Sequence, residues 1–224
     1  MQITYRWYVL KLEGKIISPD HFERKALGAV SQDFWFSSDK QTNEALRFFK
    51  KIDIPVERID AQGNRDVQVI QTVSSVGISL MAGKRASLLR VADPGRNMRA
   101  LMDALEQVLG YGLSTRAVVF ESVDVSTLLE KFDVSKLIGL KLTNMVFGND
   151  CVGRMEFVSK NGIELSAIKA LRGLSYKYEY AKYELLYRAL KGSFSYSSSG
   201  LVRVGGQLSG RIVELLEKQL LKFC

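Results

Sequence analysis

A run of basic and aromatic side chains near the C-terminal end carries the most suggestive chemistry in this sequence. Tyrosines recur between residues 176 and 187, and lysines and arginines are interspersed among them and beyond. Lysine and arginine neutralise phosphate groups, and aromatic rings stack on nucleobases. The residues expected to contact nucleic acid are Lys177, Lys182, Arg188, Lys191, Tyr196 and Arg203. They predict a non-enzymatic nucleic-acid-binding protein of weak sequence selectivity, because phosphate contacts carry no sequence information.

The segment Lys191-Gly192-Ser193-Phe194-Ser195-Tyr196 is the most specific piece of this pattern. It is similar to the basic-glycine-aromatic strand of RNA-recognition domains, in which exposed rings stack on bases. It departs from that strand after the glycine, where a serine replaces an aromatic residue. Packing of Phe194 and Tyr196 in a core is therefore favoured over base stacking, since tyrosine tolerates both water and burial.

The elements that must position these residues are a tyrosine-rich strand, a hairpin and a closing helix. Tyr176, Tyr178 and Tyr180 alternate as on a strand, although Tyr176, Tyr180, Tyr183 and Tyr187 also fit a helical stripe; β propensity favours the strand. Residues 193–196 and 201–204 alternate around a serine and glycine turn, which predicts a hairpin. An amphipathic helix running to about residue 222 follows, with an apolar face of Leu208, Ile212, Leu215, Leu216 and Leu220.

Other chemistry is poorly supported. His21 is the sole histidine, which excludes zinc sites that need two histidines. Asp20 and Glu23 would share one helical turn, so they cannot converge on a metal from neighbouring strands as nuclease carboxylates do. Lys84 follows a glycine but lacks the rest of a phosphate-binding P-loop. No catalytic residue, metal ligand or cofactor is predicted, and an enzyme working through Asp20, Glu23, Asp93, Asp124 or Asp133 is the third hypothesis.

Composition and charge agree with a basic globular protein. The chain has 224 residues and a formal net charge of +8. Residues 1–100 carry +5, residues 101–150 carry −3 and residues 151–224 carry +6, which makes an anionic partner plausible if the basic parts share a surface. The two cysteines form no disulfide framework, so a reduced cytoplasmic setting is expected. Neither a signal peptide nor an apolar run long enough for a membrane helix is recognisable.

The remaining elements follow from periodicity and turn residues. Helix burial is expected at Phe22, Ala26, Leu27 and Val30, and Gly77 is expected to be a bulge. Asp and Ser should cap two short helical turns, near residues 123–126 and 132–135. In order, the sequence predicts a strand at 2–12, helices from 18 and at 42–51, a mobile loop at 55–66, strands at 67–81 and 86–91, a helix at 96–109, strands at 116–123, 139–147 and 152–159, and a helix at 164–171.

Together these elements predict an α+β protein of mostly antiparallel sheet with helices packed on one face. The order of the last elements is similar to one half of the TATA-binding saddle, a curved sheet backed by helices. That resemblance implies two ferredoxin-like or saddle-like halves. The expected division is an N-terminal α+β domain at 1–135 and a C-terminal sheet and helix domain at 136–224, closely packed on the first.

The alternative to nucleic-acid binding is a protein-interaction subunit of a bacterial or phage multi-protein complex. Its tyrosine and leucine faces would then be buried against a protein partner or a second copy of the chain. The expected partners are therefore the phosphate backbone of a nucleic acid, or a protein, with no membrane.

Overall fold

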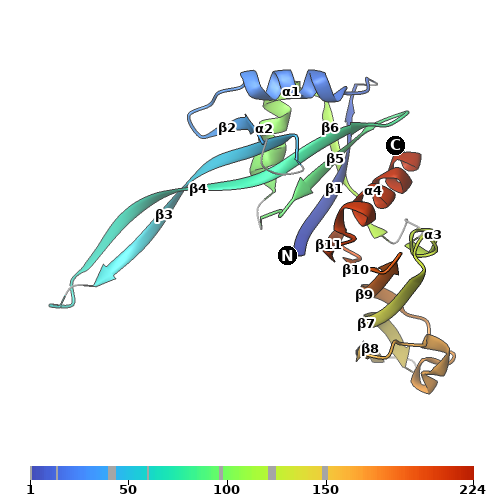
Figure 1. Ribbon diagram of the computed structural model, residues 1–224. Coiled ribbons are helices and arrows are strands. Elements are labelled where there is room, and N and C mark those ends of the chain that lie inside the picture. The colour runs from blue at the N-terminus through green and yellow to red at the C-terminus, as the bar shows by residue number, and fades with distance from the viewer. Residues whose placement is uncertain are drawn as a thin grey trace.

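The computed structural model describes residues 2–13, 15–39, 44–59, 61–95, 98–120, 125–147 and 151–224. Within these residues one antiparallel sheet of eleven strands runs in the order β2-β3-β4-β5-β1-β11-β10-β9-β7-β8, with β6 also paired to β1 (Figure 1). The α+β class is confirmed, with the sheet as the dominant element. The strands are β1 (Gln2–Leu12), β2 (Phe34–Ser38), β3 (Leu46–Ile59), β4 (Arg65–Ala82), β5 (Ser87–Ala92), β6 (Leu113–Ala117), β7 (Val134–Phe147), β8 (Cys151–Val158), β9 (Lys177–Tyr187), β10 (Leu190–Ser197) and β11 (Leu201–Gly206).

Four α-helices accompany the sheet in the described part of the chain. They are α1 (Pro19–Gly28), α2 (Arg99–Leu109), α3 (Val125–Leu129) and α4 (Ser209–Leu220), and short 3-10 turns lie at Leu165–Ala167, Lys169–Leu171 and Leu221–Phe223. Among the described residues, no helix combines the length and the apolar content that crossing a membrane requires.

Strand β1 is the centre of the fold, and its two faces are buried by different helices. Tyr8 and Leu10 belong to the apolar core under α1 and α2, whereas Tyr5 and Trp7 belong to the core under α4. Since successive side chains on a strand point to opposite faces, α1 and α2 cover one face of the sheet and α4 covers the other. The expectation that the helices share one face is therefore not confirmed. The expectation of two similar halves is not confirmed either.

The largest correction concerns residues 42–66. The predicted helix at 42–51 is wrong, because β3 already begins at Leu46, and the predicted loop at 55–66 is wrong except for the turn at residues 61–63. Residues 42 and 43 lie outside the described part. Strands β3 and β4 pair without interruption from Leu46 opposite Ile78 to Ile59 opposite Arg65. They leave the body of the molecule together as a long two-stranded arm (Figure 1).

The predicted bulge at Gly77 is also wrong, since the register of β4 continues through it on both sides. The absence of a side chain at Gly77 instead makes room for Glu44. A Cβ placed at Gly77 would lie 2.7 Å from Cγ of Glu44, so glycine lets the Glu44 side chain cross β4 closely.

Several smaller expectations are confirmed or corrected in the first half. Ser18 caps α1 by accepting a hydrogen bond from the His21 amide, and Phe22 and Ala26 are buried as predicted. Leu27 and Val30 are instead exposed, because the helix buries the stripe through Phe22 and Ala26 and ends at Gly28. The strands predicted at 2–12, 67–81 and 86–91 are present, and the helix predicted at 96–109 corresponds to α2, Arg99–Leu109. The strand expected at 116–123 lies earlier, at Leu113–Ala117, and residues 121–123 are outside the described part.

The C-terminal elements follow the predictions more closely. The Tyr-rich segment is a strand, the hairpin and last helix are present, and β7 pairs with β8. The predicted helix at 164–171 consists of two 3-10 turns. The second predicted helical turn is wrong, because Val134 begins β7 and Asp133 accepts a hydrogen bond from the Arg188 amide at 2.7 Å. Asp124 and the turn at 148–150 lie outside the described residues.

The division at residues 135 and 136 stays a prediction. Strand β11 pairs with β1 from Gln2 opposite Gly205 to Arg6 opposite Leu201, so the last strands extend the same sheet as the first. The core under α4 likewise combines Trp7 and Leu88 with Val202 and Val204. The two predicted parts therefore share both a sheet and a core.

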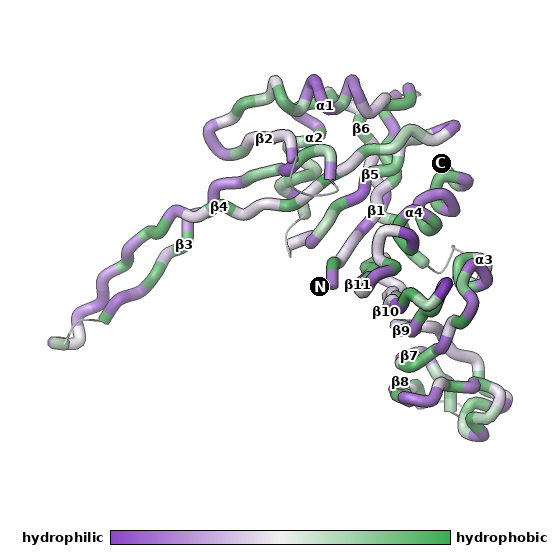
Figure 2. Tube along the Cα trace, in the orientation of Figure 1, coloured by the Kyte–Doolittle hydropathy of each residue, from purple (hydrophilic) through white to green (hydrophobic). Residues whose placement is uncertain are grey.

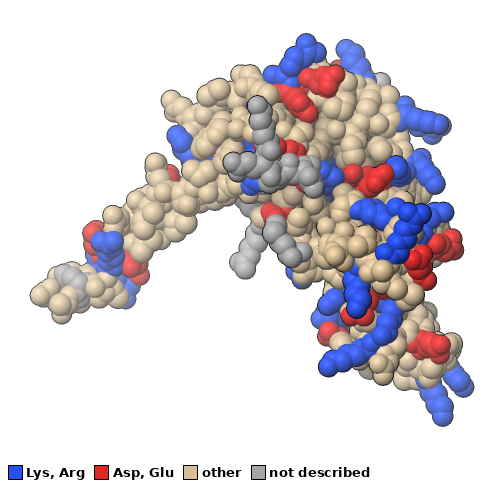
Figure 3. Space-filling view, viewed as in Figure 1, with Lys and Arg blue, Asp and Glu red and all other residues tan. Residues whose placement is uncertain are grey.

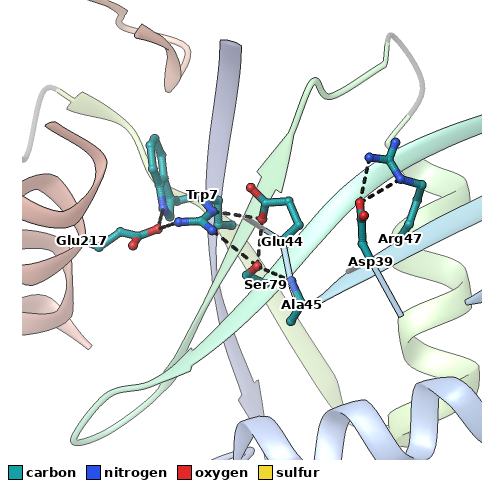
Figure 4. A network of polar contacts seen from close by, with 8 residues as sticks. Trp7, Asp39, Glu44, Ala45, Arg47, Ser79 and Glu217 are labelled. Carbon is teal, nitrogen blue, oxygen red and sulfur yellow. Dashed lines mark hydrogen bonds and ion pairs between the residues drawn. The ribbon is translucent and has the colours of Figure 1, made fainter. Parts of the chain in front are cut away.

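A buried polar network ties α4 to the sheet (Figure 4). The Arg90 guanidinium on β5 donates to Glu217 Oε1 of α4 at 2.8 Å and to Glu44 Oε2 at 3.1 Å. Trp7 Nε1 donates to the same Glu217 oxygen, and Ser79 Oγ donates to Glu44 at 2.8 Å. Figure 4 shows Trp7 with Glu217 on one side of this network and Glu44 with Ser79 on the other. Burial is the largest influence on the pKa of Glu217 and raises it, whereas Arg90 and Trp7 act to lower it.

Candidate nucleic-acid interface

Strands β11 and β10 have one face under α4, and the same face of β9 and β7 continues into a further apolar core that includes Leu140, Leu142 and Ala181. The second face of these four strands is covered by no described helix core. Val202, Val204 and Phe194 point into the core under α4. The residues between them therefore point the other way, to the same side of the sheet as α1 and α2, which pack farther along on β2, β4 and β6. We call this surface the open face. Its polar residues are Arg6, Lys136, Lys141, Lys182, Lys191 and Arg203, together with Tyr180, Glu184, Ser193, Ser195 and Ser197.

Strand register brings the basic residues of the open face into rows. Arg203 lies opposite Ser195, and Ser195 lies opposite Lys182, so the two cations are separated by one serine-bearing strand. Two strand spacings place them about 10 Å apart. Because paired residues share a face, Arg203 and Lys182 present their charges side by side although 20 positions separate them in the sequence.

A hollow of about 440 Å³ lies next to this row. Gly192, Gly205 and Gly206 form part of its wall, and Lys136 and Lys191 stand at it together with Glu184 and Ser193. Glycine leaves the strand backbone uncovered, and each lysine ammonium is a mobile point charge with three donors. Lys136 Nζ already donates to the carbonyl of Lys160, which holds that side chain over the sheet. The hollow can accept a phosphate or the edge of a base.

The open face is basic overall. Its six cations stand against the carboxylates of Glu184 and Glu156, and Glu156 is paired with Lys141 at 3.0 Å. Arg154 on β8 and Glu179 on β9 lie 4.0 Å apart beside it and add no net charge. Figure 3 shows Lys and Arg side chains interspersed with Asp and Glu side chains around β7 to β11 and α4, and few charged side chains along the shaft of the arm.

Three of the six residues predicted to bind nucleic acid, namely Lys182, Lys191 and Arg203, share the open face. Arg188 lies in the turn between β9 and β10 with its guanidinium 5.3 Å from the centre of the Tyr187 ring. Arg211 of α4 lies over the same ring at 3.8 Å, which places Tyr187 on the α4 side. Arg188 therefore belongs to the rim of the sheet.

Tyr196 belongs to the other side of β9 and β10, whereas Lys177 at the start of β9 is paired with Thr143 of β7. The Tyr196 ring packs 5.4 Å from Phe120 and 5.8 Å from Phe194, measured between ring centres. Burial raises the pKa of Tyr196 and of its neighbour Tyr183, and the two hydroxyls are hydrogen-bonded. Lys177 lies with Tyr196 at a separate hollow of about 320 Å³. Tyr196 thus has the core role that its sequence favoured, and the tyrosine on the open face is Tyr180.

Sequence reasoning missed Arg6, Lys136 and Lys141, which come from segments far from the Tyr-rich strand. Arg6 donates through Nη2 to the Ser199 carbonyl at 3.2 Å, and its guanidinium lies 5.5 Å from the Tyr8 ring centre. Its buried Nε has no hydrogen-bond partner within the described residues. The alternation of Arg6 with Tyr5 and Trp7 signals an outward position on β1. The pairing of β1 with β11, which a local pattern does not encode, brings it to the open face.

In the described part of the chain, no three His, Cys, Asp or Glu residues lie close enough to hold a metal ion. Asp93 accepts a hydrogen bond from the Thr4 amide at 3.1 Å, and Asp133 holds the Arg188 amide. Asp20 and Glu23 lie on α1, and Asp124 is outside the described residues. Asp93 and Asp133 thus serve local structure.

Comparison with known proteins adds no assignment, since no family model matches this sequence and no curated protein matches it.

Proposed function

We propose that this protein is a non-enzymatic nucleic-acid-binding protein that holds the phosphate backbone on the open face. The observation that supports this most is that six cations from β1, β7, β9, β10 and β11 share one face of the sheet. Only two carboxylates among the described residues of that face balance their charge. A basic sheet face that no described helix covers suits single-stranded nucleic acid, which can lie across it with its bases unstacked.

Sequence selectivity should be weak. Lysine and arginine would contact phosphates, and Ser193 and Ser197 offer short hydroxyls with little power to discriminate base edges, whereas Ser195 is only 2% exposed. Tyr180 is the aromatic residue best placed to stack on a base, because it shares the face with Ser197 and Lys141. The part of the sheet that carries α4 on one side and the open face on the other would be the saddle-like part. A cytoplasmic setting fits this function and the protein-interaction alternative.

The direct test is a binding titration with labelled single-stranded DNA, single-stranded RNA and duplex DNA of about 20 nucleotides at low salt, since binding through phosphates is strongest there. Fluorescence anisotropy or filter retention reports the bound fraction. We expect the single strands to bind with little dependence on sequence. The proposal fails if none of the three is retained even at about 20 mM salt.

One observation favours the second candidate, a protein-interaction subunit of a bacterial or phage complex. The arm formed by β3 and β4 exposes a long series of apolar residues that no part of the described chain covers. A surface of this kind usually marks a contact with another protein. The two functions use different surfaces and are compatible.

A further inference from the structure

The outer part of the arm is a two-stranded ribbon with no third strand on either side. Strand β2 pairs with β3 only as far as Lys50, and β5 pairs with β4 only as far back as Gly77. We call residues 51–59 and 65–75 the outer arm. An isolated two-stranded ribbon is marginally stable in water. Its large apolar side chains are nevertheless exposed, between 38% and 65% of their area, at Ile52, Ile54, Ile59, Val67, Val69, Ile70 and Val73.

The charge of the outer arm argues against a nucleic acid as its partner. Three basic and three acidic residues balance one another on it, and residues 67–76 of β4 carry no charge at all. Figure 2 shows apolar residues recurring along both strands, and Figure 3 shows charged side chains gathered near the tip instead of along the shaft. A ribbon that entered a groove of DNA would need a surplus of cations. The partner is expected to be an apolar protein surface.

The two edges of the outer arm differ. The Lys51 amide donates to the Asp33 carbonyl at 2.9 Å, so odd-numbered residues of β3 direct their N–H groups away from β4. Pro55 is one of these odd-numbered residues and has no N–H, so the outer edge of β3 lacks a donor that a further strand would need. On β4 the odd-numbered residues lie opposite those of β3, so they also direct N–H and C=O outward. This edge has neither a proline nor a charge between Val67 and Val76.

We propose that two copies of this chain pair antiparallel through the free edges of β4, about a two-fold axis near Ile70. The result is a four-stranded sheet in the order β3-β4-β4-β3, in which the exposed Val67, Ile70 and Val73 gain cross-strand neighbours. An antiparallel pairing of a strand with itself uses the same patch on both copies, as a two-fold interface requires.

Charge and edge protection both favour a second copy over a strand of another protein. With the axis at Ile70, Asp66 and Arg65 of one copy fall opposite Ser74 and Ser75 of the other, so no like charges meet. Pro55 then lies on both outer edges of the four-stranded sheet and prevents further strand addition. The pairing closes at two copies, whereas a free apolar edge would otherwise grow into open-ended aggregates.

Light scattering coupled to size exclusion tests the proposal across about 1 to 100 µM protein, a range in which interfaces of micromolar dissociation constant respond. The full chain is expected to be a dimer. Val69→Pro removes an N–H from the free edge while leaving the β3 ladder intact, and should raise the dimer dissociation constant on the order of 100-fold. Asp53→Pro is the control. Like Pro55, residue 53 directs its backbone nitrogen to the outer edge of β3, which is not in the proposed interface, so this variant should leave the dimer unchanged.

Cross-linking tests the geometry without depending on proline. In a Cys151→Ser background, Ile70→Cys should be joined between copies by a short bismaleimide. Ile59→Cys should not, because antiparallel arms place these residues roughly 30 Å apart along the ribbon. A monomeric wild type, an open-ended oligomer, a dimer that survives Val69→Pro, or cross-linking through residue 59 would each overturn the proposal. A monomer that forms a complex only with another protein would assign the edge to that protein instead.

Discussion

Replacing Arg90 with leucine is expected to lower the free energy of unfolding by about 3–5 kcal/mol, the cost of breaking a buried ion pair by removing one partner. Arg90 has 11% of its side chain exposed, and its partners Glu44 and Glu217 have 5% and 12% exposed. Leucine would leave both carboxylates buried without their shared guanidinium. Urea unfolding followed by tryptophan fluorescence measures the loss, and Trp7 lies within the network as a reporter.

The pH dependence separates lost charge pairing from lost packing. Burial already raises the pKa of Glu217, and Arg90 opposes that rise, so removing Arg90 should raise the pKa further. A carboxyl whose pKa is higher in the folded state than in the unfolded state stabilises the folded state at low pH and loses this advantage as pH rises above its unfolded value. The deficit of Arg90→Leu should therefore be smaller at pH 5 than at pH 8.

The matched control is Arg99→Ala on α2, which removes an exposed ion pair to Asp103 at 3.9 Å. Exposed pairs contribute about 0–1 kcal/mol, so this variant should unfold almost as the wild type does. Equal losses for Arg90→Leu and Arg99→Ala, or a deficit that does not change with pH, would show that the network does not anchor α4.

The second large effect is expected from charge reversal on the open face. Lys182→Glu combined with Arg203→Glu replaces two cations by two anions. These two residues lie on either side of Ser195 in the sheet. Repulsion of phosphate should weaken binding to single-stranded nucleic acid by about 100-fold or more at 0.1 M salt. Anisotropy titration measures the change, and circular dichroism checks that the variant is folded.

Lys84→Glu combined with Arg85→Glu is the control for charge alone. These two residues are also one lysine and one arginine, both exposed, but they lie in the turn between β4 and β5. The control changes the net charge by the same amount at a different place and should weaken binding far less. Equal losses in both pairs would indicate a diffuse field and no specific face.

The sequence predicted the parts of the fold that local patterns encode. Alternation marked β1 and the β10–β11 hairpin, the content of Val, Ile, Ser and Thr marked β4, and the turn before it marked β5. The β3 half of the arm was missed because residues 42–51 also fit a helical stripe, and because the outer arm has no buried face to give β3 a strand-like alternation. Polar residues and Pro55 made it resemble a loop. Cross-strand pairing, which is not local, decided its structure.

The candidate interface was only partly predictable for the same reason. The alternation of Leu201 to Val204 puts Arg203 on the side away from the valines, but which side is uncovered depends on where α4 packs. Tyr196 was correctly suspected of a core role. Arg6 and Lys136 reach the open face through pairings between β1 and β11 and between β7 and β9, and these join segments far apart in the chain.

The salt dependence of binding tests the central claim most directly. Each phosphate contact contributes about −0.7 to −0.9 to the slope of log association constant against log salt concentration. The wild type should show a steep negative slope with single-stranded DNA, and Lys182→Ala combined with Arg203→Ala should reduce its magnitude by about 1.4, the share of two lost contacts at about 0.7 each on a single strand. Binding that is absent, that ignores salt, or whose slope is the same in wild type and double variant would contradict a phosphate-binding open face.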